Sequence, residues 1–154
     1  MHGRIFEIRE ERLPREEWMK ASDFYEEDTR GWCDYLHDSE DRKDDLDWLK
    51  SGLPSSIFKV DGDKIEIISD GKEFVEEWIA ELKEEVNKLT YDTFTQGVAA
   101  TKVKTKLNSM IKSGFMFYTD YACYPHNPTS FIRDCITAHQ GKTFYVCGII
   151  DYHY

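Results

Sequence analysis

The chain has 154 residues, of which 40% are apolar and 14% aromatic, so it can build a packed core and is neither a disordered nor a low-complexity chain. Its 30 acidic and 20 basic residues give a formal net charge of −10 at pH 7, which argues against holding nucleic acid through bulk positive charge. The sequence shows neither a secretion signal nor a membrane span, so we expect a cytoplasmic protein whose four cysteines are reduced thiols.

The start of the chain predicts one strand and one short helix. Residues 4–9 place apolar side chains among alternating charges, which is typical of a strand. Pro14 fits the first turn of a short helix, because the N–H that proline lacks is not needed there. Residues 23–37 are rich in aromatic side chains but follow no clear period, so they predict no regular element.

A surface helix is expected over residues 39–50. Asp38 or Ser39 would cap its first turn. Leu46 and Leu49 give this helix only a narrow apolar edge. The helix should therefore lie on the outside of the domain, with most of its surface in water.

Residues 57–68 predict a β-hairpin. With Gly62 and Asp63 at the tip, Val60 lies opposite Ile65 on one face of the hairpin. A turn placed one residue earlier would set Val60 opposite an aspartate. Because one face of the hairpin has to be buried, the first register is the expected one.

Residues 70–90 carry the clearest helical pattern of the chain. Apolar side chains recur at helical spacing on one side, and charged side chains occupy the other. Asp70, followed three residues later by Glu73, fits a capping box at the start of this helix. A second helix is expected over 98–112, although residues 102–107 also alternate like a strand.

The last part of the chain predicts a strand, a helix and a strand. Residues 115–123 form an aromatic strand, and Asn127 followed by Pro128 is a strong start signal for a helix over 128–140. Residues 143–150 are apolar on both faces, so this strand is expected in the interior of the sheet.

This order of elements predicts a single α+β domain with a mixed or largely antiparallel sheet of four to five strands. The sheet would be packed by helices at about 39–50, 70–90, 98–112 and 128–140 and would include the hairpin at 57–68. A weak subdivision near residue 92, where the charge balance changes, is the alternative organisation.

The acidic residues are concentrated in the first part of the chain. Residues 1–92 contain 27 acidic against 14 basic residues, whereas residues 93–154 contain 3 acidic against 6 basic. Such an asymmetry suggests a polar interaction surface. Solvated helix faces, which aid solubility, are the simpler explanation of the same charges.

The charge pattern leads to the hypothesis of a non-enzymatic binding protein that contacts a basic protein surface. It would be an acidic mimic of nucleic acid that inhibits a basic nucleic-acid-binding protein or a defence enzyme, with association that depends on salt. The candidate binding residues are Asp38, Glu40, Asp41, Asp44, Asp45, Asp47, Glu76, Glu77, Glu81, Glu84 and Glu85. This hypothesis needs no cofactor, no direct contact with nucleic acid and no membrane, and it leaves the oligomeric state open.

The alternative hypothesis is a small enzyme or zinc protein that uses cysteine and histidine. The candidate ligands are Cys123, His126, Cys135 and His139, in a spacing that matches no common zinc site. A thiolate of Cys123 or Cys135 beside a histidine, with Asp134 nearby in sequence, is the corresponding nucleophile. Cys135 and His139 also belong to the apolar stripe of a predicted helix, where buried cysteine acts as a small apolar side chain.

Overall fold

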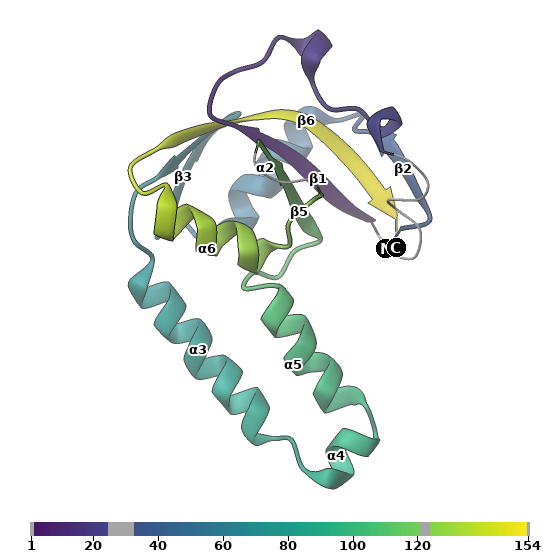
Figure 1. The fold of residues 1–154 in the computed structure, drawn as a ribbon, viewed down its shortest axis with the longest axis vertical. Helices are drawn as coiled ribbons and strands as arrows, with labels where there is room; N and C mark the ends of the chain where they lie inside the picture. Colours follow the sequence, from purple (N-terminus) through teal and green to yellow (C-terminus); the bar gives the residue numbers. More distant parts are fainter. Residues whose placement is uncertain (1, 25–32, 121–123, 154) are drawn as a thin grey trace.

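The computed structural model describes residues 2–24, 33–120 and 124–153, and it shows a mixed six-stranded sheet with helices (Figure 1). The strands are β1 (His2–Arg9), β2 (Tyr35–Asp38), β3 (Phe58–Asp61), β4 (Lys64–Ile67), β5 (Phe115–Thr119) and β6 (Thr143–His153). The α-helices are α2 (Arg42–Gly52), α3 (Lys72–Asn87), α4 (Tyr91–Thr95), α5 (Val98–Asn108) and α6 (Pro128–Ala138). The predicted single α+β domain is confirmed, with one strand more than expected.

The long last strand, β6, is the centre of the sheet. One edge of β6 pairs antiparallel with β4 near its start and with β2 near its end, and the other edge pairs antiparallel with β1. The strand β5 pairs with the other edge of β1, and this is the single parallel pair among the described strands. The interior position predicted for residues 143–150 is therefore confirmed, and it explains why this strand is apolar on both faces.

The predicted hairpin is confirmed in its register. Val60 pairs with Ile65, and Asp61 pairs with Lys64, which places Gly62 and Asp63 at the tip. Gly62 has a φ of 57°, a left-handed conformation that glycine adopts without steric cost. The buried residues of this hairpin all contribute to one face, as the alternation in sequence requires.

The two faces of the sheet are covered by different kinds of structure. The helices α2 and α6 lie on one face, where Leu49 and Ile132 share the main core with Phe6 and Phe117 (Figure 1). The segment that follows β1 crosses the other face and places Met19 in a second, smaller core. The sheet is therefore the middle layer of the domain.

The predicted helix after Pro14 is wrong. The segment forms only two 3-10 turns, Arg15–Glu17 and Ala21–Asp23. Tertiary contacts explain the difference, because the Met19 N–H donates to a buried carboxylate on β1 and is not available to a helix.

The cap expected at Asp38 or Ser39 is also wrong. The side chain of Asp41 accepts the hydrogen bond from the Asp44 N–H, across 3.1 Å, and α2 begins after it. Asp38 instead ends β2, a strand that the sequence analysis did not predict. The missed strand lies within an aromatic segment whose pairing partner, β6, is more than a hundred residues away.

The prediction at Asn127 and Pro128 is confirmed. The Asn127 side chain accepts from the Ser130 N–H across 2.9 Å, and Pro128 is the first residue of α6. The preceding strand ends at Thr119, and the remainder of its predicted range includes 121–123, which lie outside the described residues.

The helices α3, α4 and α5 form an arm that projects from the sheet and its covering helices (Figure 1). The predicted capping box is wrong, because Gly71, with a φ of 63°, precedes the first helical residue. Asp70 accepts only a hydrogen bond from the Lys72 N–H, across 3.1 Å. Phe74 on α3 reaches the main core, as do Met110 and Ile111 after α5. No described helix is long and apolar enough to cross a membrane.

Candidate functional site

The candidate acidic residues fall into two groups on separate parts of the molecule. One group surrounds the start of α2, which packs against the sheet, and the other follows α3 along the projecting arm (Figure 1). The members of the first group are Asp38, Glu40, Asp41, Asp44, Asp45 and Asp47, and those of the second are Glu76, Glu77, Glu81, Glu84 and Glu85. The two acidic groups therefore lie on different parts of the molecule, one beside the sheet and one on the arm.

The carboxylates of α3 have lysine partners within the arm. Glu84 and Glu85 lie 3.1 and 2.8 Å from the Nζ of Lys88, and Glu81 binds Lys106 of α5. The lysine hydrogen bonds hold the pKa values of Glu81 and Glu85 below the ordinary carboxylate value. Much of the negative charge of α3 is thus balanced locally, by ion pairs that are exposed or partly exposed.

One residue of the α2 group is part of the interior. Asp45 is buried, accepts from the Arg4 guanidinium across 2.6 Å, and binds the Ser39 hydroxyl. Glu40, Asp44 and Asp47 remain exposed around the first turns of α2.

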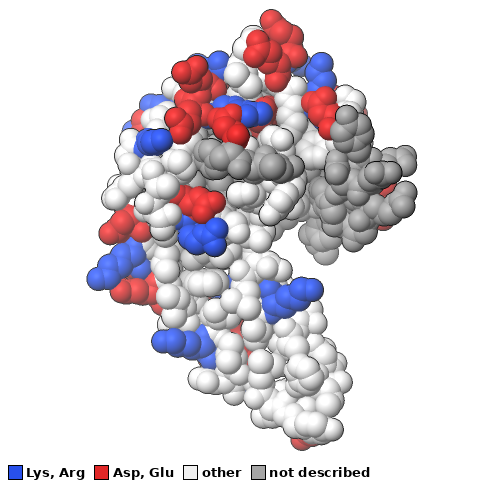
Figure 2. All heavy atoms as spheres, viewed as in Figure 1, with Lys and Arg blue, Asp and Glu red and all other residues white. Residues whose placement is uncertain are grey.

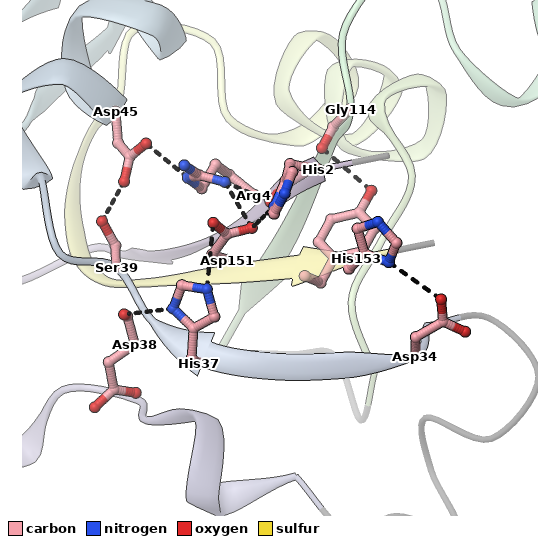
Figure 3. A network of polar contacts seen from close by, with 12 residues as sticks. His2, Arg4, Asp34, His37, Asp38, Ser39, Asp45, Gly114, Asp151 and His153 are labelled. Carbon is pink, nitrogen blue, oxygen red and sulfur yellow. Dashed lines mark hydrogen bonds and ion pairs between the residues drawn. The ribbon is translucent and has the colours of Figure 1, made fainter.

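A polar network at one end of the sheet centres on the buried carboxylate of Asp151 (Figure 3). Arg4 of β1 lies 2.8 Å from Asp151 on β6 and also binds Asp45 of α2. His2 is 3.1 Å from one oxygen of Asp151, and His37 of β2 is 3.5 Å from the other. The network ties β1, β2, β6 and α2 together.

Aromatic rings extend this network along the edge of the sheet. The ring of Tyr35 stacks on His37 and on His153, with centroid distances of 5.9 and 5.2 Å. The Ser39 hydroxyl donates to Asp45 (Figure 3), and the Tyr152 hydroxyl donates to the carbonyl of Gly114 across 3.1 Å. These contacts join β6 to the residue before β5 and Ser39 to α2, so we assign the network a structural role.

Three of the four cysteine and histidine residues of the alternative hypothesis are described by the structure. Cys135 is buried in the main core, and burial strongly raises the pKa of its thiol above the ordinary value. His139 packs its ring against Phe144 at a centroid distance of 5.3 Å, and His126 lies 3.7 Å from Asp134. Cys123 is outside the described residues, and among those described no three His, Cys, Asp or Glu side chains are placed to hold a metal ion.

A pocket lies beside the end of β1. Its lining residues are Arg9, Glu10, Glu11, Leu13 and Asp120. The Arg9 guanidinium already binds Asp120 and Glu7. The one cation that could attract an anionic ligand in this pocket lining is therefore already paired with two carboxylates.

The arm is the most unusual surface of the molecule. No residue between 72 and 108 is buried, although this stretch contains three helices. At its tip, Tyr91 is 83% exposed and Phe94 and Val98 are each 63% exposed. Farther up the arm, Ile79, Val86 and Leu107 are also exposed apolar side chains. When only two helices pack together, part of the apolar stripe of each helix stays exposed, because the stripe is wider than the surface that one neighbouring helix covers.

Sequence reasoning found the apolar stripe of residues 70–90 but did not show where it would lie. The helices α3 and α5 pack on each other and not across the sheet. The missed residues of the Asp151 network also come from distant parts of the chain, His2 and His153 from the first and last strands. Comparisons with protein-family models, with curated proteins and with solved structures found no match.

Proposed function

We propose that this protein is a non-enzymatic binding protein whose projecting arm docks onto a partner protein. The observation that carries the proposal is the combination of six exposed apolar side chains with the absence of any buried residue over 72–108. Monomeric soluble proteins scatter such side chains singly, and a cluster of them marks an interaction surface.

The energetics support an occupant for this surface. Full burial of a Val, Leu, Ile or Phe side chain gives about 1.5–3 kcal/mol, so covering six partly exposed side chains yields several kcal/mol. Helices of this length gain most of their stability from packing of an apolar face. A partner that covers the arm would therefore stabilise it as well as bind to it.

The tip carries residues of the type that anchors interfaces. Tyr91 and Phe94 are aromatic, and aromatic side chains supply much of the binding energy of protein interfaces. The turn that presents them is itself ordered by a capping box between Thr90 and Thr93. The two rings can therefore be removed without breaking the cap.

The test is quantitative affinity capture with three forms of the full chain. The wild type is compared with a Tyr91→Ser, Phe94→Ser variant and with Ile68→Ser, which removes an exposed apolar side chain from the body of the domain. A protein retained by the wild type and by the Ile68 control, lost by the tip variant, and bound directly when purified would support the proposal. Equal binding of that protein by the tip variant would contradict it.

The acidic residues around α2 favour a second proposal, contact with a basic protein surface as a mimic of nucleic acid. Glu40, Asp44 and Asp47 are exposed at the start of one helix, and none of them forms an ion pair within the described residues. Titration into basic nucleases and DNA-binding proteins at low and high salt tests this proposal. Loss of binding in a Glu40→Gln, Asp44→Asn, Asp47→Asn variant is expected, whereas binding that is independent of salt would contradict it.

A further inference from the structure

The two sides of the arm carry different charges. On one side, Glu81 of α3 binds Lys106 of α5. The pKa of Glu85, four residues on, is lowered first by its hydrogen bond to Lys88 and further by the charges of Lys102 and Lys106 on α5. Residues four apart share one side of a helix. The acidic groups of α3 and the basic groups of α5 thus meet along this side, and their charges offset each other.

The opposite side of the arm is apolar, with lysine at its edges. Ile79, Lys83 and Val86 are spaced by four and then three residues, so they share a side of α3 that lies away from Glu81. Lys104 and Leu107 are three residues apart and share a side of α5, whereas Lys106 lies on another side of that helix.

The view in Figure 2 shows a largely uncharged surface along the arm, with Lys or Arg side chains and some Asp or Glu side chains at its edges. Ile79, Val86 and Leu107 are all exposed. Neither Lys83 nor Lys104 forms an ion pair within the part of the chain that the structure describes. Lys72, on the same edge as Lys83, is 3.9 Å from Glu76. This side of the arm is therefore apolar, and its rim is positive on balance because Lys72, Lys83 and Lys104 outnumber Glu76, in a protein whose net charge is −10.

A second copy of the chain fits this surface poorly. Pairing the same side of two arms would bring lysine edges together, and two chains of charge −10 repel each other at long range. A single helix laid along the shallow side between α3 and α5 fits better, because it completes a three-helix arrangement at ordinary interhelical distances of about 8–10 Å.

We infer that this side of the arm binds an acidic amphipathic helix of a partner protein. The inference rests on the proposed function and specifies the chemistry of the partner. An apolar stripe on that helix covers Ile79, Val86 and Leu107, while Asp or Glu residues beside the stripe reach Lys83 and Lys104. The long lysine stems pack on the helix while their ammonium groups meet the carboxylates at the rim.

The probe is a pair of helical peptides of about 18 residues with the same leucine stripe. One peptide carries glutamate beside the stripe and the other carries lysine at the same positions. Binding to the full chain is measured by fluorescence anisotropy at about 50 mM and about 500 mM salt, and the site is located by NMR shifts of amides on α3 and α5.

The glutamate peptide is expected to bind at least about tenfold more tightly than the lysine peptide at low salt. The preference should reverse in a Lys83→Glu, Lys104→Glu variant and persist in the matched control Lys43→Glu, Lys50→Glu, which changes two exposed lysines of α2. The difference between the peptides should shrink at high salt.

Three results would overturn the inference. Equal binding of both peptides, abolished by Leu107→Ser, would refute the acidic partner but leave the arm as a docking surface. Failure of both peptides to bind a monomeric chain would refute the helix as occupant. Self-association of the wild type, measured by light scattering and removed by Leu107→Ser, would assign the surface to a second copy. Failure of the proposed function would be seen in a different experiment, as a partner that the Tyr91→Ser, Phe94→Ser variant captures as well as the wild type does.

Discussion

The buried carboxylate of Glu7 is the most informative residue for testing how this fold is held together. Glu7 is fully buried in β1 and lies where the register between β1 and β6 shifts. One of its oxygens accepts from the backbone N–H of Met19, across 2.8 Å, and from that of Gly148, across 2.7 Å. The other oxygen lies 2.7 Å from the Arg9 guanidinium. Glu7 therefore joins the bulged centre of the sheet to the segment that covers it.

The expected loss of stability follows from the partners that a substitution leaves behind. Glu7→Leu removes the acceptor of two buried N–H groups, each costing about 1–3 kcal/mol when unsatisfied. It also removes one of the two carboxylate partners of Arg9, which is partly exposed and keeps Asp120, so the two N–H groups, at about 2–6 kcal/mol together, set the scale of the loss. We therefore expect a loss of about 3–5 kcal/mol, out of a typical stability of about 5–15 kcal/mol. Glu7→Gln keeps one acceptor oxygen and should lose about 1–3 kcal/mol.

The assay is urea unfolding followed by circular dichroism and tryptophan fluorescence, with thermal unfolding as a second measurement. A domain of this size shifts its Tm by about 2–4 °C per kcal/mol, so Glu7→Leu should lower Tm by about 6–20 °C. The matched control is Glu10→Gln, because Glu10 is exposed and its ion pair with Lys142 lies in solvent. Faster hydrogen exchange at the amides of Met19 and Gly148 is expected in the Leu variant.

A Glu7→Leu variant within about 1 kcal/mol of the wild type would refute this reasoning, because it would show that the two N–H groups find other partners at little cost. A loss of stability without faster exchange at the two amides would show that the damage lies elsewhere in the core.

Three further predictions concern other parts of the molecule. Gly148→Ala should destabilise the domain, because a Cβ there would lie 2.4 Å from the carbonyl oxygen of Met19; unfolding equal to that of the wild type would show that the covering segment can move away. Cys135 should resist iodoacetamide at pH 8 until the protein unfolds, because burial raises the pKa of its thiol; labelling of the folded protein, read by peptide mass spectrometry, would contradict its burial. The pKa of Glu81 is held below its ordinary value of 4.5 by the Lys106 hydrogen bond, so this pair stabilises the arm fully above about pH 4.5 and is lost as the pH falls through the lower, folded-state pKa. After correction for the slower intrinsic exchange in acid, the protection factors of α5 amides should therefore fall more in the wild type than in Glu81→Gln, and an equal fall in both would argue against the pair.

Elements with local signals were predicted well. The register of the β3–β4 hairpin follows from the position of Gly62 and from the alternation that includes Val60 and Ile65. The start of α6 follows from an asparagine cap and a proline at the first position. The same reasoning failed at Asp70, because the predicted capping box does not form and Gly71 is the residue that precedes α3.

The candidate site was predictable only in part. The sequence identified the acidic residues and the apolar stripe of residues 70–90, but it did not distinguish exposed Asp44 from buried Asp45. The guanidinium that binds Asp45 belongs to Arg4, which lies 41 residues earlier in the sequence. No local pattern encodes such a contact.

Local sequence patterns predicted the secondary structure where a turn, a cap or a period lies within a few neighbouring residues. Long-range contacts were needed to bury Glu7, to join β2 to β6 and to turn the apolar stripe of α3 toward α5 with part of it uncovered. The physical reason is that amphipathic spacing specifies which side chains avoid water, whereas the surface that covers them is supplied by distant parts of the chain or by another molecule.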